Sequence, residues 1–235
     1  MILNIIPAID LIDGQSVRLS QGDYDEKIIM PKTPQEAVQY YSQFPQVSRI
    51  HVVDLIGAAE QKAVEAPIIE QIKKLTNIPL ELGGGLRSIE TIQLYDDLGI
   101  DYFILGSRAI LDVAWLIKIV ELYPGRIFVG IDARDEDIYV NGWKEKSDRQ
   151  IEEYVKEIEP LDLAGIIYTD ISKDGMEQGP NVGRTAQLND STRHLVVASG
   201  GVRGQEDLTA LEDAGVLEAI VGKAAQNDSF WKGLN

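Results

Sequence analysis

The chain repeats part of itself at a fixed distance, and this repeat limits its possible folds more than any other feature. The stretch Gly83-Gly84-Gly85-Leu86-Arg87 returns as Ser199-Gly200-Gly201-Val202-Arg203, so that each position has its equivalent 116 residues later. The same distance relates Gly106 to Gly222. An internal repeat of this size indicates a fold built from two similar halves.

Each copy has the pattern of a strand, a glycine turn, a helix, a second strand and a second small-residue turn. Glycine lets the backbone approach a ligand closely, and the N–H groups at the start of a helix attract anions. One glycine pair alone would indicate only a tight turn, but matched pairs favour two phosphate sites. The predicted phosphate-binding residues are Gly84, Gly85, Gly106 and Ser107 in the first half, and Gly179, Gly200, Gly201, Gly222 and Lys223 in the second.

The composition excludes several classes of function. The 235 residues include no cysteine, which rules out disulfides, thiolate metal sites and a cysteine nucleophile. The net charge of −16 disfavours nucleic acids and anionic membranes as partners. Phosphate binding must therefore be local, from backbone N–H groups and a few cations among Arg18, Arg87, Arg108, Arg203 and Lys223.

The first residues lack the basic and long apolar regions of a signal peptide, so we expect none, and no apolar run approaches the roughly 18 residues of a membrane span. We expect a cytoplasmic protein that acts as a monomer on a small bisphosphate. We also expect no cofactor, because Gly83-Gly84-Gly85 lacks the spacing of a dinucleotide-binding loop.

Strand and helix patterns alternate along the whole chain. Thr33, Pro34 and Glu36 form a capping box that predicts a helix over 34–44, and a further helix is predicted over 151–158. We predict a loop from Gly14 to Asp23, and a hairpin or lid over 133–149. The eight predicted strands are 1–10, 49–54, 78–82, 102–105, 127–132, 164–170, 195–198 and 218–221.

This alternation predicts an α/β fold with a parallel sheet. Two matched halves of four strands close most naturally into a single (β/α)₈ barrel over residues 1–235, with half-barrels of roughly 1–124 and 125–235. A doubly wound open sheet is the alternative, but it would not explain why the halves are equivalent.

The active site of such a barrel lies at the carboxyl ends of its strands. Asp10 and Asp132 each end a strand, one in each half, and we expect them to face each other between the phosphate sites. Paired carboxylates in unequal environments provide one acid and one base. Asp54 and Asp170 also end strands, so a magnesium site made by the four aspartates is a minority interpretation.

The two histidines are assigned to structural roles. His194 precedes its strand and belongs to the opposite end of the barrel. His51 lies three residues before Asp54, and we therefore expect it on the other face of that strand. With no cysteine and no histidine in the site, proton transfer is left to carboxylates.

Several motifs resemble the phosphoribosylformimino-5-aminoimidazole carboxamide ribotide (ProFAR) isomerase family of histidine biosynthesis, in order over nearly the whole chain. They are Ile6-Pro7-Ala8-Ile9-Asp10-Leu11, Asp13-Gly14, Val17-Arg18-Leu19, Gly22-Asp23-Tyr24, His51-Val52-Val53-Asp54-Leu55, Gly83-Gly84-Gly85-Leu86-Arg87, Tyr168-Thr169-Asp170-Ile171-Ser172-Lys173-Asp174-Gly175 and Ser199-Gly200-Gly201-Val202. The resemblance implies a duplicated barrel and a substrate with a phosphate at each end. It also implies an Amadori rearrangement of an aminoaldose to an aminoketose.

The resemblance also implies roles for individual residues. Asp10 matches the base that takes a proton from C2, and Asp132 matches the acid that protonates the ribose ring oxygen, with Asp174 as its rival. Thr169 matches a residue that holds the substrate, and we expect Trp143 on a loop that closes over the imidazole and stacks on it.

One position departs from the family, which usually has aspartate where this chain has Ile56, and this puts substrate contacts from that loop in question. The sister cyclase of the pathway typically has lysine at the position of Arg18 and cysteine at that of Ala8. At both positions this sequence therefore resembles the isomerase. An isomerase that also serves tryptophan synthesis remains open. A phosphate-binding barrel without catalysis is disfavoured by the intact Asp10 and Asp132.

Overall fold

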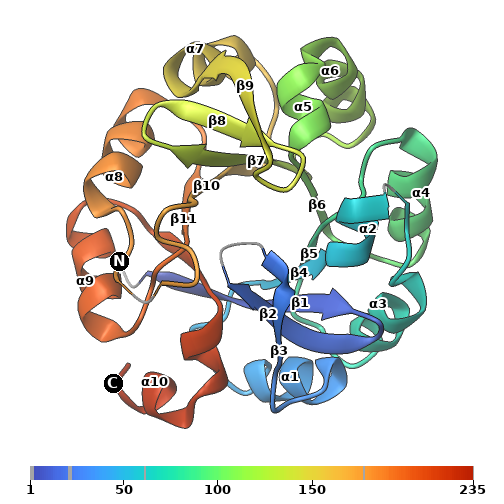
Figure 1. Ribbon diagram of the computed structural model, residues 1–235, viewed down its shortest axis with the longest axis vertical. Coiled ribbons are helices and arrows are strands. Elements are labelled where there is room, and N and C mark those ends of the chain that lie inside the picture. Colours follow the sequence, from blue (N-terminus) through green and yellow to red (C-terminus); the bar gives the residue numbers. More distant parts are fainter. Residues whose placement is uncertain (1–2, 21–22, 61, 177, 235) are drawn as a thin grey trace.

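Eight parallel strands close into a barrel in the computed structural model, which describes residues 3–20, 23–60, 62–176 and 178–234. The ring closes where the last strand pairs with the first (Figure 1). The predicted (β/α)₈ fold is therefore confirmed. In order around the ring, the strands are β1 (Asn4–Ile12), β4 (Ile50–Asp54), β5 (Leu80–Gly83), β6 (Tyr102–Leu105), β7 (Ile127–Arg134), β10 (Gly165–Asp170), β11 (Val196–Ser199) and β12 (Glu218–Val221).

The helices form an outer ring around these strands (Figure 1). The predicted capping box is present at the start of α1, where Thr33 and Glu36 each accept a hydrogen bond from the other's backbone N–H. The helices are α1 (Pro34–Tyr41), α2 (Leu55–Glu60), α3 (Ala66–Lys73), α4 (Ile89–Asp97), α5 (Ser107–Leu111), α6 (Val113–Leu122), α7 (Ile151–Ile158), α8 (Val182–Ser191), α9 (Gln205–Asp213), the 3₁₀ helix η1 (Lys223–Gln226) and α10 (Asp228–Lys232).

Two antiparallel hairpins extend from the barrel. The first, β2 (Gln15–Ser20) with β3 (Asp23–Ile29), follows β1 and corrects the loop expected there; Gly22 lies outside the described residues. The second, β8 (Asp137–Val140) with β9 (Glu145–Gln150), follows β7 and confirms the predicted hairpin. Since β1 and β7 are the first strands of the two predicted half-barrels, each half carries its hairpin at the same place (Figure 1).

The core has an outer and an inner part. The larger apolar cluster fills the space between strands and helices and includes the buried rings of Trp115 and Tyr95. Inside the barrel, six buried side chains form a separate cluster: Ile6, Ala8, Phe128, Ile167, Val197 and Ile220. Arg49, just before β4, and Glu218, at the start of β12, form a buried ion pair. No described helix is long and apolar enough to cross a membrane.

Candidate active site

A cavity of about 420 Å³ opens among the carboxyl ends of the barrel strands. It has the size of an ordinary small-molecule site. All of the site residues predicted from the sequence line it except Gly179. The lining residues that were predicted are Asp10, Arg18, Gly84, Gly85, Gly106, Ser107, Asp132, Trp143, Thr169, Asp174, Gly200, Gly201, Gly222 and Lys223.

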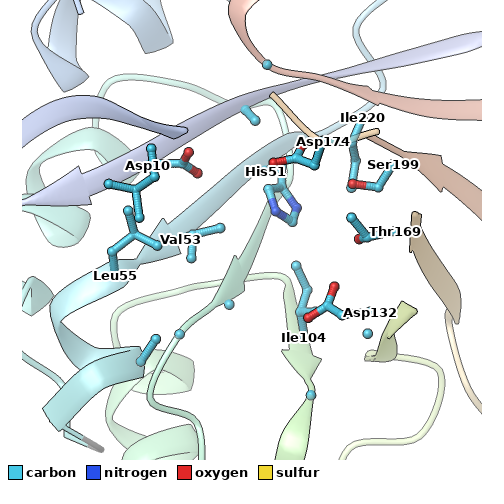
Figure 2. Close-up of a pocket in the computed structure, with 18 of the residues that line it drawn as sticks. Asp10, His51, Val53, Leu55, Ile104, Asp132, Thr169, Asp174, Ser199 and Ile220 are labelled. Atoms are coloured by element: carbon cyan, nitrogen blue, oxygen red, sulfur yellow. The ribbon is translucent and has the colours of Figure 1, made fainter. Parts of the chain in front are cut away.

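Strand register explains why the carboxylates share this cavity. Partners in a parallel sheet point to the same face, and Asp132 on β7 is the partner of Thr169 on β10. In the other half, Asp10 on β1 is the partner of Val53 on β4, which also lines the cavity. Figure 2 shows the carboxyl groups of Asp10 and Asp132 on different sides of the cavity.

Arg18 holds two of the three carboxylates. Its guanidinium, on β2, donates from Nη1 to Asp10 at 3.1 Å and from Nη2 to Asp174 at 2.9 Å. Asp174 lies in the loop after β10, so this one cation joins the first hairpin to a loop of the second half. Burial raises the pKa of Asp10, and the charge of Arg18 opposes that rise.

Asp132 has different surroundings. Burial raises the pKa of its carboxyl group, and hydrogen bonding with Trp143 and Thr169 only partly offsets the effect. The ion pairs found for Asp10 and Asp174 both go to Arg18, whereas the hydrogen-bonding partners of Asp132 are neutral side chains. The site therefore contains two carboxyl groups of raised pKa, one beside a guanidinium and one among neutral donors.

The first glycine-lined end of the cavity is built by backbone packing. Gly84 and Gly85 both have positive φ, at +94° and +71°. A side chain at Gly84 would stand 2.1 Å from the carbonyl oxygen of Asp54, and one at Gly85 would stand 2.7 Å from that of Gly57. Glycine is therefore required here for both conformation and space.

The second end repeats this arrangement. Gly200 and Gly201 have φ of +89° and +84°, and the carbonyl oxygens of Asp170 and Gly179 face them. A side chain at Gly201 would stand 2.5 Å from the oxygen of Gly179. Gly179 thus supports Gly201 from behind and does not line the cavity, which corrects its assignment as a binding residue.

Asp54 and Asp170 end their strands as predicted, but they do not line the cavity and have structural roles in both halves. Asp54 accepts hydrogen bonds from the backbone N–H groups of Gly57, Val64 and Glu65. Asp170 accepts bonds from Ser172 and from the Asn181 side chain. Each aspartate anchors the loop behind a glycine pair and faces away from Asp10 and Asp132, so the four carboxylates do not converge on a magnesium site.

Two arginines lie at the first glycine-lined end of the cavity. Arg87 and Arg108 line the cavity, and Arg108 donates to the backbone oxygen of Arg87. Arg87 also donates to the side-chain oxygen of Asn141 at 3.1 Å, and Ser107 accepts from the backbone N–H of Asn141 at 2.8 Å. The tip of the second hairpin, which carries Trp143, is therefore attached to this end.

The repeat equivalent of Arg87 points elsewhere. Arg203 is bound to Asp207 through its backbone N–H, Nε and Nη2, and it does not line the cavity. At this second end the cation beside the glycines is Arg18, whose guanidinium lies about where a side chain of Gly222 would stand, 2.8 Å from Nη1. Lys223 also lines the cavity here.

His51 lines the cavity, and its assignment outside the site is wrong. His51 and Asp54 lie on opposite faces of β4, as the alternation predicts, but Asp54 is the one that points outward. His51 is the register partner of Ala8 and of Glu81, and its Nδ1 lies 2.7 Å from Oε1 of Glu81. In Figure 2 its ring lies among Asp10, Asp132 and Thr169.

Ile56 has an apolar role. It lies on α2 and packs against Ile12, Val17 and Leu19, beneath the first hairpin. The same hairpin is bound to α2 by the hydroxyl of Tyr24, which donates to the backbone oxygen of Leu55 at 2.8 Å. Where the family usually has an acidic side chain, this chain therefore has an apolar support for the hairpin.

Comparison with known families agrees with this geometry. Residues 4–230 match the model of a family described as histidine biosynthesis protein. The chain belongs to this family. The match includes all eight barrel strands and both hairpins. The family contains ProFAR isomerase and the cyclase of the same pathway, so the chain is a member of an enzyme family of histidine biosynthesis.

Proposed function

We propose that the chain is the ProFAR isomerase of histidine biosynthesis, an intramolecular oxidoreductase that converts the aminoaldose to the aminoketose by an Amadori rearrangement. One observation carries the proposal: Asp10 and Asp132 line one cavity whose two ends are matching glycine turns. A substrate with a phosphate at each end would place its ribose between the carboxyl groups.

The glycine ends support phosphate binding through their backbone. Positive φ at the four paired glycines leaves no side chain between the backbone and a ligand. Arg87 and Arg108 supply charge at one end, and Arg18 and Lys223 supply it at the other. These local cations offset the repulsion expected from a chain of net charge −16.

The surroundings of the three carboxylates favour Asp132 as the acid. A general acid has to carry a proton at the working pH. Burial raises the pKa of Asp132 and outweighs the opposing hydrogen bonds of Trp143 and Thr169, which favours its protonated form. Asp174 would have to give up its ion pair with Arg18 to carry a proton. Asp10, whose ionised form is favoured by the same guanidinium, is then the base.

The proposed reaction begins with ring opening. Asp132 donates its proton to the ribose ring oxygen as the bond from that oxygen to C1 breaks, which leaves an iminium between C1 and the nitrogen. Asp10 then takes the proton from C2, and an enolamine forms. Each acid or base step of this kind contributes about 10²–10⁴-fold to the rate.

The isomerase is favoured over the cyclase by the residues in the site. Arg18, where the cyclase typically has lysine, bridges two carboxylates through separate nitrogens. A lysine amine has no such planar pair of donors. Ala8, where the cyclase typically has cysteine, packs in the apolar cluster inside the barrel.

Turnover of the aminoaldose, followed by absorbance and by NMR of the product, tests the proposal. We expect the wild type to form the aminoketose, and we expect Asp10→Asn and Asp132→Asn each to lose at least about 10²-fold in kcat while still binding the bisphosphate. Glu65→Gln is a matched control, because Glu65 is a buried carboxylate that binds Gly14 outside the cavity.

Three results would contradict parts of the proposal. A wild type that binds the bisphosphate without converting it would leave a binding protein. Conversion of the aminoketose with ammonia, but not of the aminoaldose, would identify the cyclase. An Asp132→Asn variant with wild-type turnover would move the acid role to Asp174.

A further inference from the structure

The proposed reaction has to return one proton to Asp132, and this inference rests on that proposed function. When the enolamine becomes the ketone, C1 gains a proton and the hydroxyl oxygen on C2 loses one. Asp10 can return to C1 the proton that it took from C2. Asp132 has meanwhile lost its proton to the ring oxygen. The proton of the C2 oxygen therefore has to return to Asp132, and a basic group that lies between the two can carry it.

His51 is in the right place to be this group. It is on β4, between β1, which carries Asp10, and β5. Its ring lines the same cavity as both aspartates. In the view of Figure 2 the imidazole lies between the carboxyl groups of Asp10 and Asp132, with Asp174 drawn beside it and Thr169 nearby.

Glu81 fixes the chemical form of the ring. This carboxylate is fully buried, and its two oxygens have separate partners: Oε1 lies 2.7 Å from Nδ1 of His51, and Oε2 accepts from Nε of Arg49 at 2.7 Å. Burial alone would raise the pKa of Glu81, but His51 and Arg49 together hold it below its usual value.

An ionised carboxylate can only accept hydrogen bonds, so Nδ1 of His51 must carry the hydrogen in this contact. The neutral ring then has its lone pair on Nε2, the nitrogen not held by Glu81. A buried carboxylate that fixes the tautomer and orientation of a histidine is a recurrent way of preparing a proton acceptor. Arg49 is held in turn by Glu218, at 2.5 Å, and by the ring of Phe128.

We propose that His51 is a proton carrier of the isomerase, oriented by Glu81, and that its Nε2 takes the proton from the C2 hydroxyl as the ketone forms. In this step the O–H bond breaks, the C2–O double bond forms, and the electron pair of the former enolamine double bond takes the proton from Asp10 at C1. His51 then passes its Nε2 proton to Asp132. All groups return to their starting state, as an isomerisation requires.

The second histidine shows what a purely structural ring looks like in this protein. His194 is buried, and its Nε2 lies 3.3 Å from the backbone oxygen of Ile158. It does not line the cavity. The acidic partner of His51 and its place in the cavity therefore distinguish the two rings.

The variant His51→Asn tests the proposal, because asparagine keeps an N–H that can reach Glu81 and removes the second ring nitrogen. In D₂O, we expect turnover to fall by about 10²-fold. We also expect deuterium at C2 of the recovered aminoaldose, because Asp10 still removes the C2 proton and the stalled enolamine returns to substrate. Asp10→Asn should show neither turnover nor deuterium uptake, and His194→Gln should behave as wild type.

Each outcome distinguishes a proton-carrying His51 from a structural one. Slow turnover with deuterium at C2 supports the proposal. Turnover within about threefold of wild type, or slow turnover without deuterium, contradicts it and leaves His51 as a structural residue. An inactive wild type would contradict the proposed function as well, so the two failures are distinguishable.

The tautomer of His51 in the wild type provides a test that needs no variant of this residue. With only two histidines in the chain, ¹⁵N NMR resolves both rings, and His194→Gln assigns them. We expect the neutral ring of His51 to carry its hydrogen on Nδ1. A hydrogen on Nε2 would contradict the proposal whatever the variants show.

Discussion

The two ends of the cavity share one backbone and differ in their side chains. At both ends a pair of glycines with positive φ packs against carbonyl oxygens, and a buried aspartate anchors the loop behind the pair. At the first end, Arg87 of the glycine loop faces the cavity and binds the second hairpin. At the second end, the equivalent Arg203 binds Asp207, and Arg18 from the first hairpin lies beside the glycines.

The two copies of the repeat therefore share their backbone conformation more closely than the partners of their side chains. Backbone packing leaves few alternatives where a side chain would meet a carbonyl oxygen. An arginine at the same place in both copies can still turn to different partners, because its long side chain reaches several of them. Identical residues in the two copies therefore predict the same backbone conformation. They do not predict where each cationic side chain points.

The largest expected difference between the two ends concerns the first glycine of each pair. Gly84→Ala would bring a methyl group to 2.1 Å from the Asp54 oxygen, whereas Gly200→Ala would meet the Asp170 oxygen at 3.3 Å. Both substitutions carry the strain of positive φ. In urea unfolding we expect Gly200→Ala to cost about 1–2 kcal/mol and Gly84→Ala about 3 kcal/mol or more. Equal losses would show that the two loops are packed alike.

The arginine pair should separate binding from structure. Arg87→Ala removes a cavity cation and its bond to Asn141, so we expect KM for the aminoaldose to rise about 10–100-fold. Arg203→Ala breaks an ion pair outside the cavity, between a half-exposed arginine and the buried Asp207, and should leave KM within about twofold. Steady-state kinetics of both variants measure the difference. A larger effect from Arg203→Ala would mean that this side chain turns toward the substrate.

The smallest expected effect is a change in stability with pH. The pKa of Asp132 is raised in the folded protein, so ionisation of this group costs folding free energy as pH rises from about the ordinary value of 3.8. Asp132→Asn should therefore be more stable than wild type at pH 7, and the gain should disappear at about pH 3.8 and below. Asp10→Asn should gain less, because it also removes a partner of Arg18.

Thermal unfolding of the three proteins between pH 3 and pH 8 measures these differences. An Asp132→Asn gain that grows toward low pH would contradict the raised pKa. Equal gains for the two variants would show that Arg18 contributes nothing to the ionised form of Asp10.

Local patterns predicted much of this fold. The capping box at Thr33, the glycine turns and the alternation of apolar strands with amphipathic helices depend on neighbouring residues, so they can be read from the sequence. The hairpin after β1 differs from the predicted loop, although Val17 and Leu19 alternate with polar neighbours, because the apolar run is short and lies between the glycines of a turn-rich segment. Its position depends on packing against α2, through Ile56 and Tyr24, which are distant in sequence.

The placement of strand residues was less predictable. Alternation fixes which residues of a strand share a face, but it does not say which face is the interior. An acidic residue that ends a strand is expected to point inward, and applying this expectation to Asp54 places His51 wrongly on the outer face. The signal that could have corrected this is Glu81, a charged residue inside an apolar strand, which needs a buried partner such as His51 or Arg49.

The pairing of two phosphate ends with one carboxylate pair is tested most directly by ³¹P NMR of the protein titrated with the aminoketose bisphosphate. Both phosphorus resonances should shift on binding, with Arg87→Ala weakening the shift of one and Lys223→Ala weakening that of the other. A single shifted resonance, or two variants that affect the same phosphate, would contradict the two-ended site.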